Sequence, residues 1–213
     1  MRATRRSWGF SDVVGLDEDC LKFVPSPCVG IIFLYPFSQV ETRKKRLGSS
    51  RGIKAAPGVW FMDQTIGNAC GAVALMHCVM NCMDRVSKDS TFLNKFRSDA
   101  KNANARERGE LFGSALRGLH DEVSGRGQTE APKPNADLDF HFITLVPVGG
   151  RLYELDGNND GPIDLGPVDD SQQAFLTAAV AHVKDVYIAP FPESHFSMMA
   201  LGPREAPAKG SGS

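Results

Sequence analysis

The sequence lacks several features that would assign it to a specialised class of protein. It has no run of about 18 apolar residues, the length that a membrane-spanning helix needs, so no membrane span is predicted. The formal net charge is only -1 at pH 7, which gives no general attraction to nucleic acid or to an anionic membrane. There is no internal repeat. The 213 residues, of which 42% are hydrophobic and 23% charged, suit one soluble globular domain with a sizeable core.

Cysteine is scarce and odd in number, which argues against a disulfide framework. The basic start, Met1–Arg6, leads into no continuous apolar stretch and is not a secretory signal, although a short Arg-rich organelle presequence stays open. We therefore expect free thiols in a reducing compartment, with the cytosol as the default. The basic stretch 41–51 is expected to be a solvated loop, and nuclear import is the alternative reading. The five cysteines are Cys20, Cys28, Cys70, Cys78 and Cys82.

Hydrophobic periodicity predicts helices and strands mixed within a single domain, residues 1–201. Gly149-Gly150 indicates an antiparallel hairpin, and strands and helices do not alternate strictly, so the predicted class is α+β. Residues 123–137 form a long irregular connection, and 202–213 a tail expected to be disordered. Val59–Met62 is a short strand or an extended lead into a helix. Strands are expected at 29–36, 138–148, 151–155 and near 195–201, and helices at 69–83, from 90 or 91, at 105–122 and at 172–184.

Cys70 is a candidate nucleophile because of its place at the start of a helix. The turn formers Gly67 and Asn68 precede it, and unpaired N–H groups on a first helical turn favour a thiolate. The N–H of Cys70 and the side-chain amide of Gln64 could together stabilise an oxyanion beside the sulfur. The alternative, that Cys70 is a small buried residue opening a core helix, is equally compatible with this segment.

The hairpin supplies a candidate base and its partner. If Gly149-Gly150 is a two-residue turn, Asp156 lies opposite Ile143, and His141 shares a strand face with Ile143. His141 and Asp156 are then diagonal neighbours, and a carboxylate fixes the tautomer of an imidazole and stabilises its protonated form. An incidental charged pair on the sheet surface remains the alternative.

The other histidines are weaker candidates. His77 lies seven residues after Cys70, about 10.5 Å along a helix and beyond hydrogen-bond reach, and is expected to be a core histidine. No partner is evident for His120, His182 or His195. Cys78 and Cys82 lack a second ligand pair with zinc-like spacing, so no metal site is predicted.

Several motifs together resemble the ubiquitin C-terminal hydrolase family, in particular its short single-domain members. These motifs are Gln64-Thr-Ile-Gly-Asn-Ala-Cys-Gly, His141-Phe, Leu152-Tyr-Glu-Leu-Asp-Gly, Gly127-Gln-Thr-Glu-Ala-Pro and Val14-Gly-Leu-Asp. The resemblance covers about residues 8–201. It implies a papain-like cysteine peptidase with a central antiparallel sheet flanked by helices, a knotted backbone, and a crossover loop at about 123–137.

The resemblance also implies how such a protein would act. Cys70 is the expected nucleophile, His141 the general base and then acid, Asp156 the orienting carboxylate and Gln64 the oxyanion-hole residue. No cofactor is expected. The partner is ubiquitin or a ubiquitin-like protein, and the enzyme is expected to be a monomer that releases small adducts and peptides. The alternative is a ubiquitin-binding module with weak or no activity. The short family members carry a lead segment before the stretch matching Trp8, so we expect an incomplete sequence or a marginally stable variant.

Overall fold

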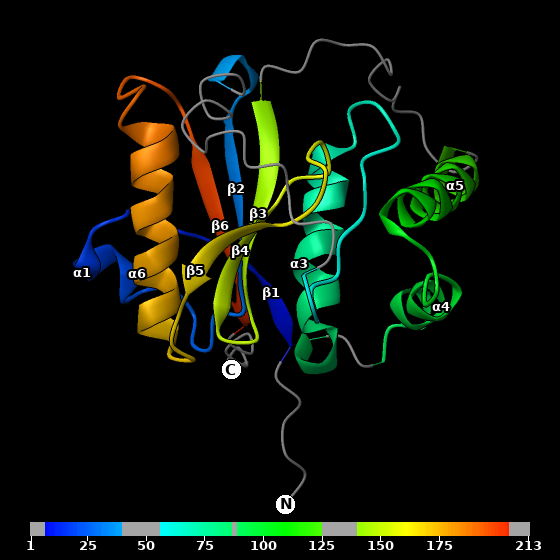
Figure 1. The fold of residues 1–213 in the computed structure, drawn as a ribbon, viewed down its shortest axis with the longest axis horizontal. Coiled ribbons are helices and arrows are strands. Elements are labelled where there is room, and N and C mark those ends of the chain that lie inside the picture. The colour runs from blue at the N-terminus through cyan, green and yellow to red at the C-terminus, as the bar shows by residue number, and fades with distance from the viewer. Residues whose placement is uncertain (1–6, 40–55, 87–88, 125–139, 205–213) are drawn as a thin grey trace, which may run out of the picture.

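The computed structural model describes residues 7–39, 56–86, 89–124 and 140–204. Within these ranges six strands form one antiparallel sheet in the order β1-β6-β2-β3-β4-β5 (Figure 1). The strands are β1 (Trp8–Asp12), β2 (Gly30–Pro36), β3 (Phe140–Val148), β4 (Arg151–Leu155), β5 (Ile163–Pro167) and β6 (Ser197–Pro203).

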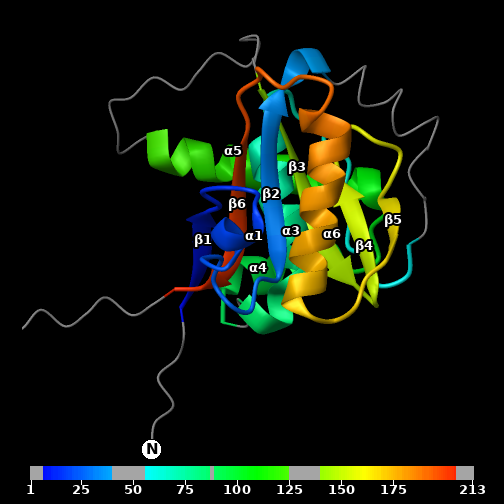
Figure 2. The same cartoon turned by 90° about the vertical axis from the view of Figure 1, so that its left-hand side faces the viewer.

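Helices cover both faces of the sheet, as the papain-like α+β prediction requires. Figure 2 shows α6 in front of the sheet and α3 behind it, with α4 and α5 beyond α3 in Figure 1. None of the described helices is long and apolar enough to cross a membrane. The helical elements are α1 (Glu18–Leu21), the short 3-10 turn η1 (Phe37–Gln39), α3 (Cys70–Val86), α4 (Thr91–Asp99), α5 (Ala105–Ser124), α6 (Gln172–Val183) and the π-helical turn η2 (Lys184–Ile188).

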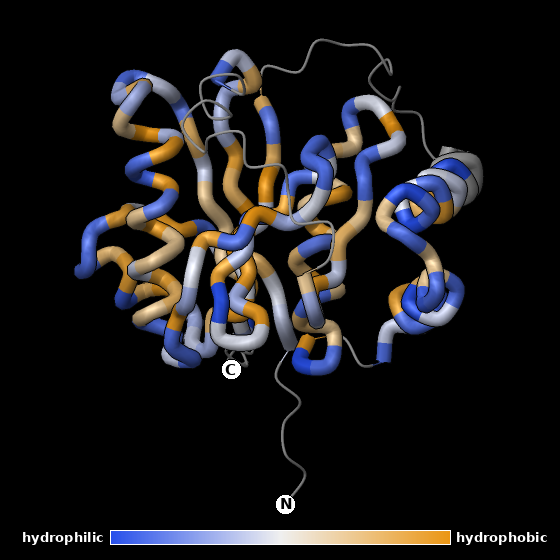
Figure 3. The backbone as a smooth tube through the Cα atoms, viewed as in Figure 1, coloured by the Kyte–Doolittle hydropathy of each residue, from blue (hydrophilic) through white to orange (hydrophobic). Residues whose placement is uncertain are grey.

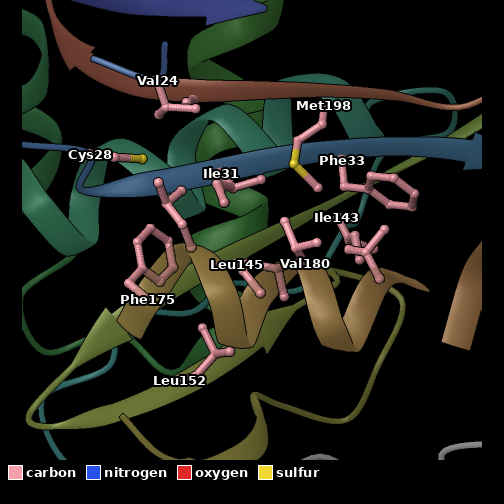
Figure 4. Packing of buried hydrophobic residues seen from close by; sticks show 14 of the residues in the cluster. Val24, Cys28, Ile31, Phe33, Ile143, Leu145, Leu152, Phe175, Val180 and Met198 are labelled. Carbon is pink, nitrogen blue, oxygen red and sulfur yellow. The ribbon is translucent and has the colours of Figure 1, made fainter. Parts of the chain in front are cut away.

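Two hydrophobic layers position the sheet between the helices. One cluster fills the space between α6 and the sheet, with Phe175 at one end and Phe33 near the other (Figure 4). On the opposite face, α3 packs its Ala74 and Cys78 toward the sheet and its Met76 toward α4 and α5. Figure 3 shows the resulting concentration of hydrophobic residues where the strands cross the middle of the molecule. Helix α3 is therefore buried on two sides, whereas its apolar pattern predicts burial nearly all round; Leu75 is 43% exposed.

Most predicted elements are present, and their local signals explain why. Ser90 and Ser171 cap α4 and α6, since their hydroxyls accept from the N–H groups of Leu93 and Ala174, both at 3.2 Å. Gly149 and Gly150 have φ values of 57° and 74°, the backbone that a two-residue hairpin turn requires.

Some boundaries differ from the sequence prediction. Strands β1 and β5 and helix α1 were not predicted. Strand β6 continues through Gly202 and Pro203, which pair with Gly9 and Trp8 on β1. The sequence prediction therefore placed the start of the tail, at residue 202, too early. The crossover loop predicted from 123 begins too early, because α5 continues to Ser124. The remainder of the tail (205–213), the basic stretch within 40–55 and the expected crossover loop from 125 onward lie outside the described residues. The expected knot depends on those last two connections.

Candidate active site

Cys70 is the first residue of α3 and lies beneath the surface with 4% of its area exposed. The preceding turn contains Asn68 in a left-handed conformation, with φ of 58°. This reversal of the chain directs the start of α3 toward the sheet, and Phe142 on β3 packs 3.4 Å from the position that a Cβ on Gly71 would occupy. The thiol therefore lies where the helical layer meets β3.

His141 and Asp156 form the pair that the hairpin register predicts. The ladder runs from Val148 paired with Arg151 to Thr144 paired with Leu155, and Asp156 follows directly. His141 Nε2 lies 2.9 Å from Asp156 Oδ1, and both residues are almost completely buried. Asp156 is held in turn by the Asn158 N–H, which donates to Oδ1 at 2.9 Å. The pair is therefore a buried, directed interaction and not an incidental contact on the sheet surface.

The thiol and the imidazole are also in contact, and each alters the other's ionisation. Burial raises the pKa of the Cys70 thiol, but hydrogen bonds with His141 and with the Phe142 and Gly71 N–H groups outweigh burial, so this pKa is lowered. Burial lowers the pKa of His141, but hydrogen bonds with Asp156 and Cys70 raise it to about 9. Both changes favour a thiolate beside an imidazolium. Since Nε2 faces Asp156, Nδ1 is the nitrogen left for the thiol.

Gln64 is attached to the same loop as Asp156. Its backbone N–H donates to the carbonyl of Gly157 at 2.8 Å, and a Cβ on Gly157 would lie 2.9 Å from the Cβ of Gln64. Within the described part of the chain its buried Oε1 has no hydrogen-bond partner. The backbone of Gln64 is therefore held beside the loop that carries Asp156, and its side-chain oxygen is not tied to another of the described residues.

The remaining histidines lie apart from the thiol. His77 is fully buried, with Nε2 3.1 Å from both the N and the O of Met62, and burial lowers its pKa to about 4, so it is the predicted core histidine. His182 does have a partner, Glu154, which sequence reasoning missed because it lies across the sheet–helix interface. His195 is exposed, and the side chain of His120 lies outside the described set.

No metal centre is visible among the residues with described positions, where no three potential ligands from His, Cys, Asp and Glu gather. The Cys82 thiol instead donates to the carbonyl of Cys78 at 3.0 Å, next to non-helical backbone at Cys82 itself. The pair therefore lies at a kink in α3.

Two aromatic rings beside His141 were not identified from the sequence. Tyr35, directly opposite His141 in the β2–β3 ladder, meets the imidazole edge-on with ring centroids 5.7 Å apart. Phe37 approaches it at 5.9 Å and is 49% exposed. Only the β2–β3 register, which joins segments about a hundred residues apart in sequence, could have identified them.

Comparison with known proteins shows similarity along nearly the whole chain. A family model described as "Ubiquitin carboxyl-terminal hydrolase, family 1" matches residues 3–189. The ubiquitin carboxyl-terminal hydrolase isozymes L1 of Rattus norvegicus and Homo sapiens are each 35% identical over 199 residues, covering 91% of this chain and 87% of theirs.

The fold is similar to that of solved structures as well. The catalytic domain of Trichinella spiralis UCH37, bound to ubiquitin vinyl methyl ester, is 25% identical with a TM-score of 0.67, covering 94% of this chain and 87% of that one. A second structure of UCH37 from the same organism, with the same ubiquitin derivative, gives a TM-score of 0.66 and covers 93% of this chain and 74% of that chain.

Proposed function

Since this chain belongs to ubiquitin carboxyl-terminal hydrolase family 1, we propose that it is a thiol-dependent hydrolase that cleaves bonds at the C-terminal glycine of ubiquitin. The observation that carries the proposal is the buried His141–Asp156 pair at 2.9 Å, in contact with the Cys70 thiol through the other side of the imidazole. A nucleophile, a base and an orienting carboxylate in that order are the requirements of covalent acyl transfer.

The reaction follows from these positions. The Cys70 thiolate attacks the carbonyl carbon of the terminal glycine, and the oxyanion accepts hydrogen bonds from the Cys70 N–H and the Gln64 side-chain amide. The imidazolium of His141 gives its proton to the leaving amine as the C–N bond breaks, leaving a thioester on Cys70. His141, now neutral, takes a proton from water, which attacks the thioester and releases the ubiquitin carboxylate and the thiolate. Asp156 keeps the imidazole oriented throughout.

Exposed aromatic residues support a protein partner at this end of the sheet. Phe37, Phe140 and Phe196 are 49%, 38% and 40% exposed. They are close neighbours, because Phe140 pairs with Pro36, the residue before Phe37, and Phe196 precedes the residue paired with Leu34. Large apolar residues exposed together are typical of interaction sites. In the proposal this apolar surface contacts the folded part of ubiquitin, while the C-terminal tail of ubiquitin reaches Cys70.

The proposal extends to small leaving groups. In the sequence, residues 125–139 join α5 to β3 and enter β3 one residue before His141. We infer from the family resemblance that this segment is a crossover loop, which would restrict what can lie on the far side of the scissile bond. Short peptides and small adducts are therefore the proposed substrates, and folded proteins joined through lysine are poor ones.

The decisive experiment compares the wild type with Cys70→Ala on a fluorogenic amide at the ubiquitin C-terminus. We expect Cys70→Ala to abolish hydrolysis but to keep ubiquitin binding, because the thiol performs the chemistry and contributes little contact area. Cys20→Ala, at a partly exposed cysteine remote in sequence, is the matched control and should remain active. Hydrolysis by Cys70→Ala at the wild-type rate would rule out this mechanism.

The rival function is a ubiquitin-binding module without activity. A ubiquitin derivative with an electrophilic C-terminus separates the two under reducing conditions. A covalent adduct on Cys70 supports the hydrolase, whereas tight binding without an adduct supports the module.

A further inference from the structure

A second buried carboxylate lies on β4, two residues before Asp156. Glu154 has no exposed surface, and its Oε2 lies 2.7 Å from Nε2 of His182 and accepts a hydrogen bond from the Tyr187 hydroxyl at 2.8 Å. Burying a carboxylate is costly unless donors of this kind satisfy it. The proposed reaction has no step for Glu154, so its role must be sought in what it holds in place.

The backbone is shaped to bring both donors to this carboxylate. His182 and Tyr187 are five residues apart, which on an α-helix would turn their side chains about 140° away from each other. The chain instead widens into the π-helical turn Lys184–Ile188, where the Ala189 N–H donates to the carbonyl of Lys184 at 2.8 Å. A wider turn returns residues five apart to nearly the same face, and such turns are frequent at functional sites.

Tyr187 in turn packs against the aromatic residues that lead to His141. Its ring centroid lies 4.6 Å from that of Tyr35 and 5.2 Å from that of Phe33, and it is buried. Tyr35, only 1% exposed, contacts the imidazole of His141 edge-on at 5.7 Å. A continuous series of contacts therefore joins Glu154 to His141 through Tyr187 and Tyr35.

We propose that Tyr187, anchored by Glu154 and His182, is a positioning residue that holds Tyr35 against His141 and so keeps the imidazole aimed at Cys70. The inference rests on the proposed function, in which His141 serves the Cys70 thiol. Tyr187 acts in this proposal through Tyr35 and has no step of its own in the reaction.

The imidazole needs this additional support because the hydrogen bond with Asp156 does not by itself keep the other nitrogen facing the thiol. The contact with Asp156 holds Nε2 but allows the ring to pivot about that bond, and a pivot carries the other nitrogen away from the thiol. Phe37 flanks the ring from a half-exposed position, where few neighbours confine it. Tyr35 is the buried neighbour, and its ring packs against those of Tyr187 at 4.6 Å and Phe33 at 6.1 Å. Small displacements of catalytic groups are costly to rate.

The test compares Tyr187→Leu and Tyr187→Phe with the wild type. Phe175→Leu serves as the control, since Phe175 lies in the same cluster but at the end away from Phe33 (Figure 4). One measurement is kcat and KM on the fluorogenic ubiquitin amide. The other is the pH dependence of Cys70 alkylation by iodoacetamide, followed by mass spectrometry of the Cys70 peptide, which requires no ubiquitin. Thermal unfolding reports on stability.

For Tyr187→Leu we expect kcat to fall by about tenfold to a hundredfold with KM unchanged, as a misaligned catalytic group would cause. The midpoint of Cys70 alkylation should move to higher pH, because the thiolate loses its facing imidazolium. Tyr187→Phe keeps the ring without its anchor and should change both quantities less, in the same direction. Phe175→Leu should lower the unfolding temperature and change neither.

Wild-type kcat and alkylation in a folded Tyr187→Leu protein would overturn the proposal, as would equal effects from Phe175→Leu. If Tyr187→Leu does not fold, Tyr187→Phe decides: an upward shift of the alkylation midpoint supports the role, and an unchanged midpoint rejects it. An inactive wild type whose alkylation still depends on Tyr187 would count against the ubiquitin hydrolase function while supporting the positioning role.

Discussion

Single side chains carry the proposed chemistry, and each is held by a neighbour of complementary character. The thiol of Cys70 is nearly buried, which alone would make it a poor nucleophile, since burial raises a thiol pKa. His141 reverses that effect, and Asp156 makes the protonated imidazole stable enough to do so. The lowered pKa of the thiol therefore depends mainly on His141, with smaller contributions from the Phe142 and Gly71 N–H groups.

The first prediction concerns that carboxylate. Asp156→Asn keeps the shape of the side chain but removes the charge that stabilises the imidazolium, and kcat on the fluorogenic amide should fall by roughly 10²- to 10⁴-fold. Unfolding measurements should show a folded protein. Asp160→Asn, an exposed carboxylate on the same loop, is the matched control and should retain activity. Near-normal turnover in Asp156→Asn would mean that the His141–Asp156 contact has no role in catalysis.

The second prediction concerns pH. Activity requires Cys70 deprotonated and His141 protonated. As pH is raised, kcat/KM should therefore increase at a pH below the usual thiol pKa, where Cys70 ionises, and should decrease near pH 9, where His141 loses its proton. Because the folded-state pKa of His141 exceeds its unfolded value of 6.5, its contribution to stability is complete below pH 6.5 and is lost as pH rises through about 9. A pH–rate profile tests this. A basic limb at the ordinary histidine pKa would contradict it.

At the scale of elements, α3 joins the site to the core. Its first residue is the proposed nucleophile, and seven residues later His77 stacks on Phe61 with ring centroids 4.9 Å apart, in the interior. The helix is held on the sheet side by Thr144, whose hydroxyl donates to the carbonyl of Ala74 at 2.7 Å. The position of Cys70 is thus determined by packing along the whole helix.

His77 provides the prediction at this scale. Burial depresses its pKa from 6.5 to about 4, so its contribution to stability is present above pH 6.5 and is lost as pH falls through about 4. The loss is about 3 kcal/mol at about 1.4 kcal/mol per pKa unit. Chemical denaturation of the wild type and His77→Gln at pH 7.5 and pH 4.5 measures it. Glutamine can still bond with Met62 but does not titrate, so the variant should lose less stability on acidification; an equal loss in both proteins would contradict the assignment.

At the scale of the whole molecule, the site lies where two layers meet. Cys70 comes from the helical layer of α3, α4 and α5, whereas His141 and Asp156 come from the sheet that α6 covers on its other face (Figures 1 and 2). The solved UCH37 structures are similar in fold over more than nine-tenths of this chain. The apolar side chains Phe37, Phe140 and Phe196 lie at the same end of the sheet as the site.

The prediction at this scale concerns the size of the leaving group. Wild type should cleave a short peptide amide from ubiquitin much faster than it cleaves lysine-linked di-ubiquitin, as expected if the segment before β3 is the crossover loop that the family resemblance predicts. Inserting several Gly and Ser residues between positions 130 and 135 should speed di-ubiquitin cleavage and leave the peptide rate unchanged. Equal rates on both substrates in the wild type would remove the proposed restriction.

Some of this organisation was predictable because it depends on residues close together in sequence. The Gly149-Gly150 turn determines the hairpin register, and that register alone brings His141 to Asp156, since strand pairing propagates residue by residue. The start of α3 at Cys70 and the cap at Ser90 likewise follow from short local patterns. Strand β1 was missed because its pairing depends on β6, at the far end of the chain.

The contact between Cys70 and His141 was decided only by the tertiary structure. About seventy residues separate them, and no register connects a helix start to a strand, so the packing of α3 on the sheet must bring them together. The Glu154–His182–Tyr187 cluster also required a π-helical turn, and the hydrophobic periodicity of the sequence does not predict such a turn. The sequence by itself determined the residue types and the local pairs, because these depend on nearest neighbours. Their assembly into one site depended on long-range packing, because only burial of the two faces of the sheet brings distant segments into contact.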